Sequence, residues 1–278
     1  MGKSSHAISG EANHDVPDDA NLSASGIAFE EVTLDYMGAS DAIRALDHLS
    51  FEVNPGESVS IIGPSGCGKS TILHLIVGLI HPTSGKVKVG GSEVDSPRTS
   101  TAFIPQDLGL MPWKTVRGNV ELGLKIRKTP KSETRARAEA ALESVGLGEF
   151  ADRYINELSG GMRQRVALAR SIAMDMDVLV MDEPLSAIDA LLREKLQDTL
   201  LGLWKRGGYT QMLVTHSIDE AVYLGEKILV MSHRPARLLK CVTNPGMGEP
   251  GYRNSAEYSD VCKKVRSALS AQLEEEPQ

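Results

Sequence analysis

The sequence predicts an α/β fold with a mostly parallel core sheet, and three observations support this prediction. Short apolar runs, typical of strands buried on both faces, recur as SVSIIG (58–63), DVLVMD (177–182), TQMLVTH (210–216) and KILVMSH (227–233). Segments with helical periodicity separate several of these runs. A glycine-rich loop also lies between the first run and a helix-forming segment. Strands that alternate with helices are typical of parallel sheets.

The composition fits one large globular domain or a domain with a subdomain. The chain has 278 residues, of which 41% are hydrophobic and 24% charged. A formal net charge of -7 argues against a general nucleic-acid binder. Three widely spaced cysteines predict neither a disulfide framework nor a zinc site, and they fit a reducing cytosol. No apolar run approaches the roughly 18 residues of a membrane span, so we expect any membrane role to come through a partner.

Local patterns divide the chain into three parts. Residues 1–25 are rich in Ser, Ala, Asn and Asp and have no helical or strand period, which predicts a disordered tail. Residues 26–242 form the predicted catalytic domain, with a helical subdomain inserted at about 107–176. Residues 243–278 form an extension. Its apolar residues recur at helical spacing and predict a short amphipathic helix: Tyr258, Val261, Cys262, Val265 and Leu269.

Within the catalytic domain, two segments with strand patterns come first, at residues 27–36 and 43–53. The second ends at a turn with Asn54, Pro55 and Gly56. The region from 115 to 147 is mostly helical in pattern, and another helix is predicted at 190–205.

The loop GPSGCGKST matches the G-x-x-x-x-G-K-[ST] phosphate-binding pattern in its expected strand–loop–helix context. Glycines allow the backbone N–H groups to surround a phosphate, and the helix N-terminus favours the anion. Lys69 would add a charge toward the β- and γ-phosphates, and Ser70 would be a ligand of Mg²⁺. The candidate nucleotide-binding residues are Gly63, Pro64, Ser65, Gly66, Cys67, Gly68, Lys69, Ser70 and Thr71.

The run VLVMDEP ends a predicted buried strand with two adjacent carboxylates. Ligands bind at the carboxyl ends of strands in open α/β sheets. We expect Asp182 to belong to the Mg²⁺ shell and Glu183 to act as general base on the attacking water. Neighbouring strand residues point to opposite faces, so the two carboxylates are not expected to be equivalent ligands.

The string LSGGMRQRVALAR opens a predicted helix that runs to about Met174. Ser159, Gly160 and Gly161 offer a hydroxyl, two flexible N–H groups and a helix N-terminus, which together suit an anion. The arginines that follow are expected to brace the helix against acidic neighbours rather than touch a nucleotide: Arg163, Arg165 and Arg170.

These motifs, in this order, resemble the ATP-binding subunit of an ATP-binding-cassette (ABC) transporter, over residues 27–239. The resemblance implies a P-loop NTPase fold with an N-terminal antiparallel β-subdomain and an inserted α-helical subdomain, and ATP and Mg²⁺ as cofactors. It implies that Gln106 contacts Mg²⁺ and the water, and that His216 contacts the γ-phosphate. His216 follows MLVT, so the residues alone also place it at a strand's carboxyl end.

The same resemblance assigns three further contacts. It implies that Tyr36 stacks on adenine, although a tyrosine in a strand also suits simple packing. It implies that Ser159, Gly160 and Gly161 bind the γ-phosphate of ATP held by a second copy of the chain, and that Asp189 contacts the partner subunit. Ile188 stands where the family usually has leucine, a mild change.

The segment after Gln106, LGLMPWKTVRGNVELGL, resembles importers of nitrate, sulfonates and taurine, as does MSHRPARLLK near the end, where His233 and Ala236 depart from the pattern. Importers of pyrimidine precursors share much of it, so the solute stays open. Trp113 suits either an anchor for a helix of a membrane subunit or ordinary core packing.

The expected partners are a second copy, membrane permease subunits and, indirectly, a solute-binding protein, with no nucleic acid. The expected place is the cytoplasmic face of the inner membrane. The alternative is a soluble ABC ATPase acting in DNA repair or translation. One cassette and a compact insert of about 50 residues between Gln106 and Ser159 argue against it.

Overall fold

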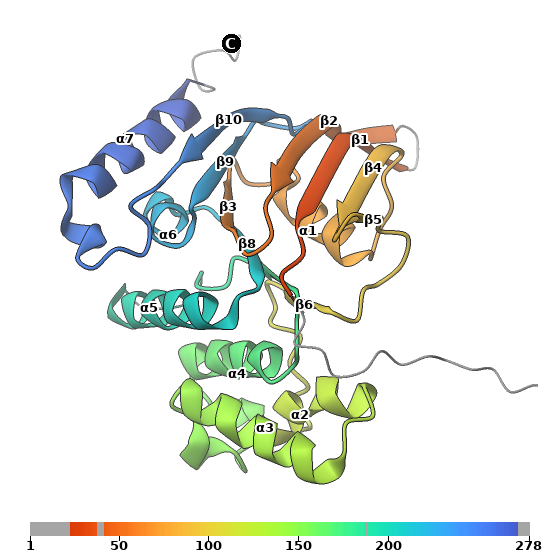
Figure 1. Ribbon diagram of the computed structural model, residues 1–278, viewed down its shortest axis with the longest axis vertical. Coiled ribbons are helices and arrows are strands. Elements are labelled where there is room, and N and C mark those ends of the chain that lie inside the picture. Colours follow the sequence, from red (N-terminus) through yellow and green to blue (C-terminus); the bar gives the residue numbers. More distant parts are fainter. Residues whose placement is uncertain (1–22, 38–41, 187, 189, 272–278) are drawn as a thin grey trace, which may run out of the picture.

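The computed structural model describes residues 23–37, 42–186, 188 and 190–271. Figure 1 shows an upper lobe built on two sheets and a lower lobe of helices, with the helix α5 (Ala190–Gly207) lying between them. Most of the predicted tail and the last seven residues of the extension lie outside the described residues.

The core sheet has six strands in the order β10-β9-β3-β8-β7-β6. All neighbours are parallel except β10, which runs antiparallel to β9. Every residue of β3, β7 and β8 is buried, as the continuous apolar runs predict for strands covered on both faces. The predicted α/β class with a mostly parallel sheet is therefore confirmed. The strands are β3 Ser58–Ile62, β6 Thr101–Ile104, β7 Val178–Asp182, β8 Thr210–Thr215, β9 Lys227–Met231 and β10 Leu238–Thr243.

A second, antiparallel sheet has the order β2-β1-β4-β5. It packs with the helix α1 (Lys69–Val77) against the core sheet, through a shared apolar cluster that includes a stacked pair, Phe29 and Phe51, with ring centroids 4.5 Å apart. This sheet agrees with the antiparallel β-subdomain that the family resemblance implies. Its strands are β1 Ile27–Met37, β2 Ala42–Val53, β4 Ser84–Val89 and β5 Ser92–Glu93.

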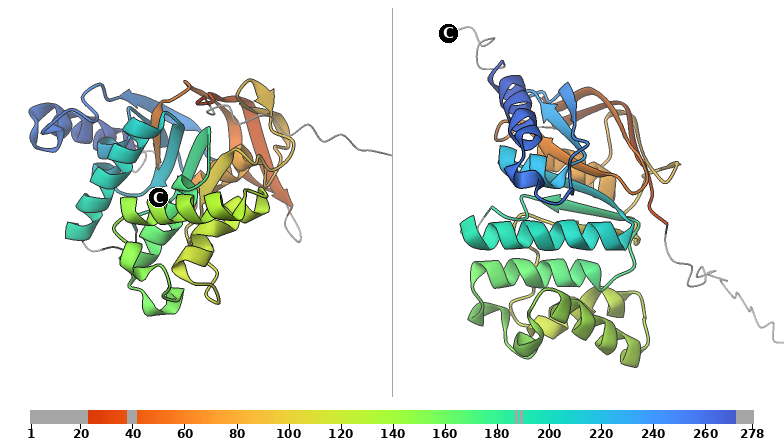
Figure 2. Two further views of the ribbon diagram at one scale, coloured as in Figure 1. Left: turned by 60° about the horizontal axis from the view of Figure 1, so that its bottom comes forward. Right: turned by 60° about the vertical axis from the view of Figure 1, so that its left-hand side comes forward.

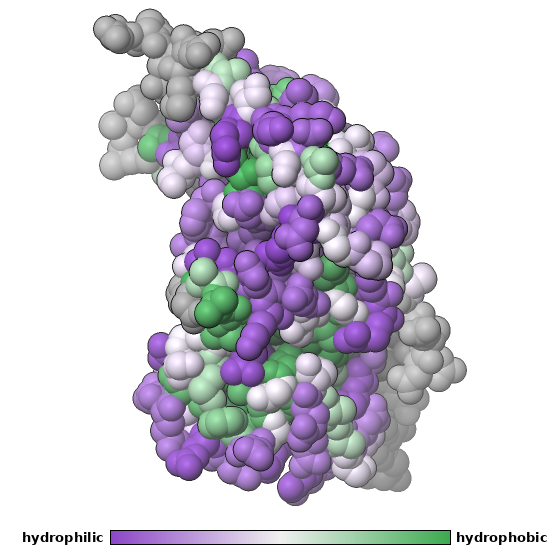
Figure 3. All heavy atoms as spheres, turned by 90° about the vertical axis from the view of Figure 1, so that its left-hand side faces the viewer, coloured by the Kyte–Doolittle hydropathy of each residue, from purple (hydrophilic) through white to green (hydrophobic). Residues whose placement is uncertain are grey.

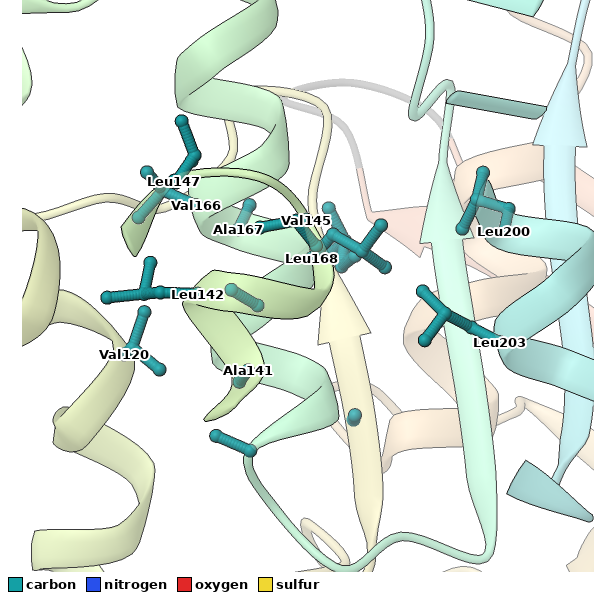
Figure 4. Packing of buried hydrophobic residues seen from close by; sticks show 14 of the residues in the cluster. Val120, Ala141, Leu142, Val145, Leu147, Val166, Ala167, Leu168, Leu200 and Leu203 are labelled. Atoms are coloured by element: carbon teal, nitrogen blue, oxygen red, sulfur yellow. The ribbon is translucent and has the colours of Figure 1, made fainter. Parts of the chain in front are cut away.

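The lower lobe consists of α2 (Val116–Ile126), α3 (Lys131–Ser144) and α4 (Gly160–Ile172), with short 3₁₀ helices at Gly148–Phe150 and Ile155–Glu157. Its apolar side chains belong to one cluster with those of α5, which lies alongside α4 in the right-hand view of Figure 2. Leu168 of α4 faces Leu200 and Leu203 of α5, while Leu142 and Val120 extend the cluster into the lobe (Figure 4). Because this core is shared, the helical lobe is positioned relative to the sheet by packing.

The arginines of α4 differ from expectation. Arg170 donates to the carbonyl oxygens of Gly109 (2.6 Å) and Leu108 (2.7 Å), and Arg165 donates to Val145 O at 3.0 Å. The prediction of acidic neighbours is wrong for Arg165, whereas Arg170 has the acidic Asp107 nearby and still donates to carbonyl oxygens. Loops that end near the helix present carbonyl groups that need donors.

The extension crosses back over the core sheet. After the helix α6 (Ile218–Leu224) and the strands β9 and β10 comes a 3₁₀ turn at Tyr252–Asn254 and then α7 (Ala256–Ser270). Tyr258, Val261 and Val265 of α7 are buried in a cluster with residues of α6 and β9. Seen from the side in Figure 3, the upper half of the surface is mostly hydrophilic, and apolar residues gather over the helical lobe below. No helix among the described residues is long and apolar enough to cross a membrane.

Candidate nucleotide site

The candidate site lies where neighbouring strands of the core sheet end. The strand β8 lies between β3 and β7, and all three are parallel, so the segments that follow them emerge at one edge. The glycine loop follows β3, Asp182 ends β7, and His216 follows β8. The sheet thus brings together residues that are more than 100 positions apart in the sequence.

The loop after β3 curls around an ammonium group. Lys69 Nζ donates to Gly63 O at 2.9 Å and to Pro64 O at 2.8 Å. Gly66 and Gly68 have φ of 73° and 122°, and a Cβ on Gly68 would lie 3.1 Å from Ala45 O. Only glycine meets both demands, because such φ values are strained for side chains. The loop leads into α1, whose N-terminus faces the loop and favours an anion.

An open cleft of about 550 Å³ lies above this loop. Its volume suits a ligand larger than a simple anion. It is lined by side chains or backbone from the glycine loop and from four other segments: Ser65, Gly66, Gly68, Lys69, Ser70, Thr71, Gln106, Glu183, His216 and Arg234.

Three predicted catalytic side chains meet at the mouth of the cleft. Glu183 Oε2 lies 3.3 Å from His216 Nδ1 and accepts a long hydrogen bond of 3.5 Å from Gln106 Nε2. Glu183 adopts φ of 46°, and its N–H donates to Val214 O at 2.9 Å, so the chain leaves the sheet at this residue. A carboxylate held between an amide and an imidazole, beside a phosphate-binding loop, can orient and deprotonate a water molecule.

Asp182 differs from Glu183 in its surroundings. It is buried behind the loop, where desolvation raises its pKa and a hydrogen bond from the Ser70 side chain opposes that rise. A buried carboxylate paired with a hydroxyl is a donor set of hard oxygens, which fits Mg²⁺ and gains from its charge. Asp182 and Ser70 therefore suit the metal shell, while Glu183 stays directed toward the cleft.

The remaining predicted contacts that the structure describes are not among the residues that line the cleft. Tyr36 is 43% exposed, and its hydroxyl lies 3.2 Å from Thr71 Oγ1, so its ring is available beside the loop. Ser159, Gly160 and Gly161 are absent from the cleft's lining among the described residues. Ser159 instead caps α4, accepting from Met162 N at 3.4 Å. Asp189, the predicted contact across the interface, lies outside the described residues.

Two features near the cleft were missed by the sequence analysis. Arg234, in the turn between β9 and β10, lines the cleft. The backbone after His216 is fixed by Thr215, whose hydroxyl accepts from Ser217 N (3.0 Å) and donates to the side chain of buried Glu220 (2.5 Å). Ser217 followed by Glu220 is the spacing of a capping box, a signal that predicts a helix start there.

Trp113 is 71% exposed. Its loop is held by Asn119, whose Oδ1 accepts from Met111 N at 2.7 Å and whose Nδ2 donates to Thr115 O at 3.0 Å. The alternative of core packing for Trp113 is therefore wrong, since the loop presents the indole ring to solvent.

This geometry defines a class. A phosphate loop, a buried metal-type carboxylate and a positioned base at the end of parallel strands form the site of a nucleoside-triphosphate hydrolase. The model of the ABC transporter family matches residues 46–186, and the chain belongs to this family. The taurine import ATP-binding protein TauB of Ruegeria pomeroyi is 43% identical over 253 residues, covering 91% of this chain and 92% of that protein.

Solved structures agree with this assignment. A dimeric bacterial ABC transporter cassette superposes with a TM-score of 0.72 at 33% identity, covering 78% of this chain and 98% of its own. The same cassette in a dimeric post-hydrolysis state, bound to ADP and phosphate, has a TM-score of 0.72 at 32% identity, with the same coverage. The chain is thus an ATP-binding and ATP-hydrolysing cassette of a transporter, and the expected P-loop NTPase ABC fold is confirmed.

Proposed function

We propose that this chain energises an importer of taurine or a related sulfonate or small anion by binding and hydrolysing ATP. The glycine loop and Lys69 hold the phosphates, and Tyr36 supports the adenine ring. Asp182, Ser70 and Gln106 would hold Mg²⁺, which supplies charge to the phosphate oxygens when bound. Glu183 accepts a proton from the attacking water. The observation that carries these roles is the meeting of Gln106, Glu183 and His216 at the cleft.

His216 positions the base in this scheme. Its Nδ1 lies 3.3 Å from Glu183 Oε2, and the backbone that follows it is fixed by the Thr215 hydroxyl, which accepts from Ser217 N. When both ring nitrogens carry a proton, the imidazolium can hold the carboxylate through Nδ1–H and donate Nε2–H toward the γ-phosphate. A shift of either side chain would misplace the water, and such misplacement costs rate steeply.

The complete site needs a second copy of the chain. Ser159, Gly160 and Gly161 stand at the start of a 13-residue helix but outside the cleft of their own subunit. A helix N-terminus with free N–H groups suits a phosphate. We assign these residues to the γ-phosphate held by the partner, with Asp189 as an interface residue. The dimeric form of the similar cassette supports this arrangement.

The remaining partners are permease subunits at the cytoplasmic face of the membrane and a solute-binding protein that delivers the solute to them. Trp113 is an exposed aromatic on a fixed loop directly after the segment of Gln106. Aromatic residues of this kind are enriched among the side chains that carry binding energy. We assign Trp113 to the permease contact. The similarity to the taurine import protein over most of both chains supports the solute class.

Glu183→Gln tests the proposed base. The amide fills the same volume but cannot accept the proton, so ATP binding should persist while turnover falls by at least about a hundredfold. Phosphate release and nucleotide binding are measured in parallel, with Glu93→Gln as the control, because Glu93 is an exposed carboxylate of β5 outside the cleft. Native-like hydrolysis by Glu183→Gln would refute the role of this residue.

The solute is tested separately. The chain is expressed, together with the permease and binding protein that copurify with it, in cells that lack sulfonate uptake, and uptake of labelled taurine is compared with that of nitrate. Uptake that requires Lys69 supports the proposal, and uptake of neither solute contradicts it.

A further inference from the structure

The turn between β9 and β10 brings an arginine into the nucleotide cleft. Arg234 belongs to the MSHRPARLLK segment, whose residues had no chemical role in the sequence analysis. It lines the cleft together with Lys69 and the glycine loop. Its Nη2 donates to Gly66 O at 2.8 Å, although the two residues are 168 positions apart. A long cationic side chain is thus hydrogen-bonded to the backbone of the phosphate-binding loop at Gly66.

The turn itself is fixed to the fold. Ala236 is fully buried, its N–H donates to Ala45 O at 2.8 Å, and its carbonyl accepts from Asp47 N at 3.1 Å. Ser232 Oγ closes the turn, because it accepts from Arg237 N at 2.8 Å. The backbone that carries Arg234 is therefore held against β2, beside the glycine loop.

The charge of Arg234 is uncompensated where the chain is described. Arg237, three residues later, is neutralised by Asp47, whose pKa this pairing lowers to about 2. Arg234 has no carboxylate partner within the described ranges and gives one donor to a neutral carbonyl. A guanidinium has five donors, so most of its hydrogen-bonding capacity faces the cleft or solvent. Fork-shaped donors of this kind match phosphate oxygens.

On the proposed function of the cleft as an ATP site, we propose that Arg234 is a second phosphate-binding cation, which contacts the phosphate chain of the nucleotide. Lys69 is held inside the loop by two carbonyl groups, and Arg234 is held on its outer side by a third. The phosphate chain would then lie between two fixed cations, one at the start of α1 and one in the turn between β9 and β10. The bond to Gly66 O also ties the turn to the loop, so nucleotide binding would order both together.

The test measures the affinity of the isolated chain for a fluorescent ATP analogue, at concentrations where the chain is monomeric and with EDTA present to prevent turnover. Arg234→Gln should weaken binding by about tenfold, the loss expected for one charged hydrogen bond that stays partly solvated. Arg234→Lys keeps the charge but loses the fork, and it should weaken binding by less, about threefold. Raising the salt concentration should weaken native binding more than binding by Arg234→Gln.

Lys240→Gln is the matched control. It removes the same charge from an exposed residue on β10, outside the cleft lining, and should leave the affinity unchanged. Lys69→Ala separates the two proposals. If Lys69→Ala loses ATP binding but Arg234→Gln binds like the native chain, the role of Arg234 is overturned and the ATP site stands. If the native chain fails to bind ATP, the proposed function itself is overturned. If Arg234→Gln keeps native affinity for the ATP analogue but no longer dimerises with ATP, Arg234 would contact the partner subunit rather than the phosphate chain, and the proposal would be refuted.

Discussion

Replacement of Asn119 tests whether a buried amide fixes the loop that presents Trp113. Asn119 has no exposed surface. Its Oδ1 accepts from Met111 N at 2.7 Å, and its Nδ2 donates to Met111 O at 3.1 Å and to Thr115 O at 3.0 Å. One side chain therefore binds both ends of a five-residue loop. Asn119→Ala would leave the Met111 N–H and two carbonyl groups without these partners.

The size of the effect follows from these three bonds. A buried hydrogen bond contributes about 1 kcal/mol net, so their loss should lower the free energy of unfolding by about 3 kcal/mol. Entry of water beside the exposed Trp113 would reduce this value, to no less than about 2 kcal/mol. Typical domains are stable by about 5–15 kcal/mol, so the variant should fold but unfold at clearly lower urea concentration.

Asn244→Ala provides the matched comparison. Asn244 is 1% exposed, and its Nδ2 donates to Val222 O and Gly225 O, both at 2.7 Å, in the extension rather than the helical lobe. Both variants should be destabilised to a similar degree. Only Asn119→Ala should speed hydrogen exchange at residues 111–115 and weaken copurification with the permease. The reasoning is refuted if Asn119→Ala costs less than about 1 kcal/mol, or if both variants loosen that loop equally.

Three further predictions address the interface, the permease and the buried acid. When Lys69→Ala chains are mixed with Ser159→Arg chains, each heterodimer should have one intact site formed across the two subunits and therefore roughly half of the ATPase activity of a native dimer. Crosslinks from Ser159 to its own subunit's ATP would contradict this. Trp113→Ala should impair permease assembly while isolated ATPase activity and urea unfolding stay near native values, since the ring is exposed; a large loss of stability would argue against docking. Burial raises the pKa of Glu220 above its ordinary value of 4.5, so its contribution to stability is complete below that value and is lost as the pH rises through the raised pKa. Glu220→Gln should therefore show a smaller decline in unfolding free energy between pH 5 and 8 than the native chain in urea titrations at each pH; equal declines would refute the burial argument.

The strand ends could be predicted from the sequence because parallel strands impose a shared edge. The run before Asp182, the run before His216 and the loop that contains Lys69 are each local patterns. A parallel sheet places their carboxyl ends together without further information. The close approach of Gln106 to Glu183 could not be predicted from these local patterns. Gln106 follows β6, and predicting that β6 lies beside β7 requires knowledge of the strand order. The family resemblance assigned Gln106 to Mg²⁺ and the water, and periodicity alone assigns it no role.

Predictions that depended on what surrounds a side chain were less successful. Trp113 is large and apolar, and its exposure results from the bonds that Asn119 makes to the loop backbone. Arg165 carries a charge that suggests an acidic partner, yet it donates its hydrogen bonds to carbonyl groups of a nearby segment. Long polar side chains accept either kind of partner, so the sequence pattern does not distinguish them.

The position of Arg234 shows why tertiary contacts can give a turn a chemical role. Gly68 cannot carry a side chain, because of its φ of 122° and its closeness to Ala45 O. The space that a Cβ would need there is bordered by the methyl group of Ala236, 3.5 Å away, so the two small residues let the turn and the loop pack closely. A larger residue at 236 would separate them and draw Arg234 away from Gly66 O. Ala236→Leu should therefore mimic the loss of ATP affinity of Arg234→Gln while every charge in the cleft is kept. Native affinity in a folded Ala236→Leu variant would show that the placement of Arg234 does not depend on this packing.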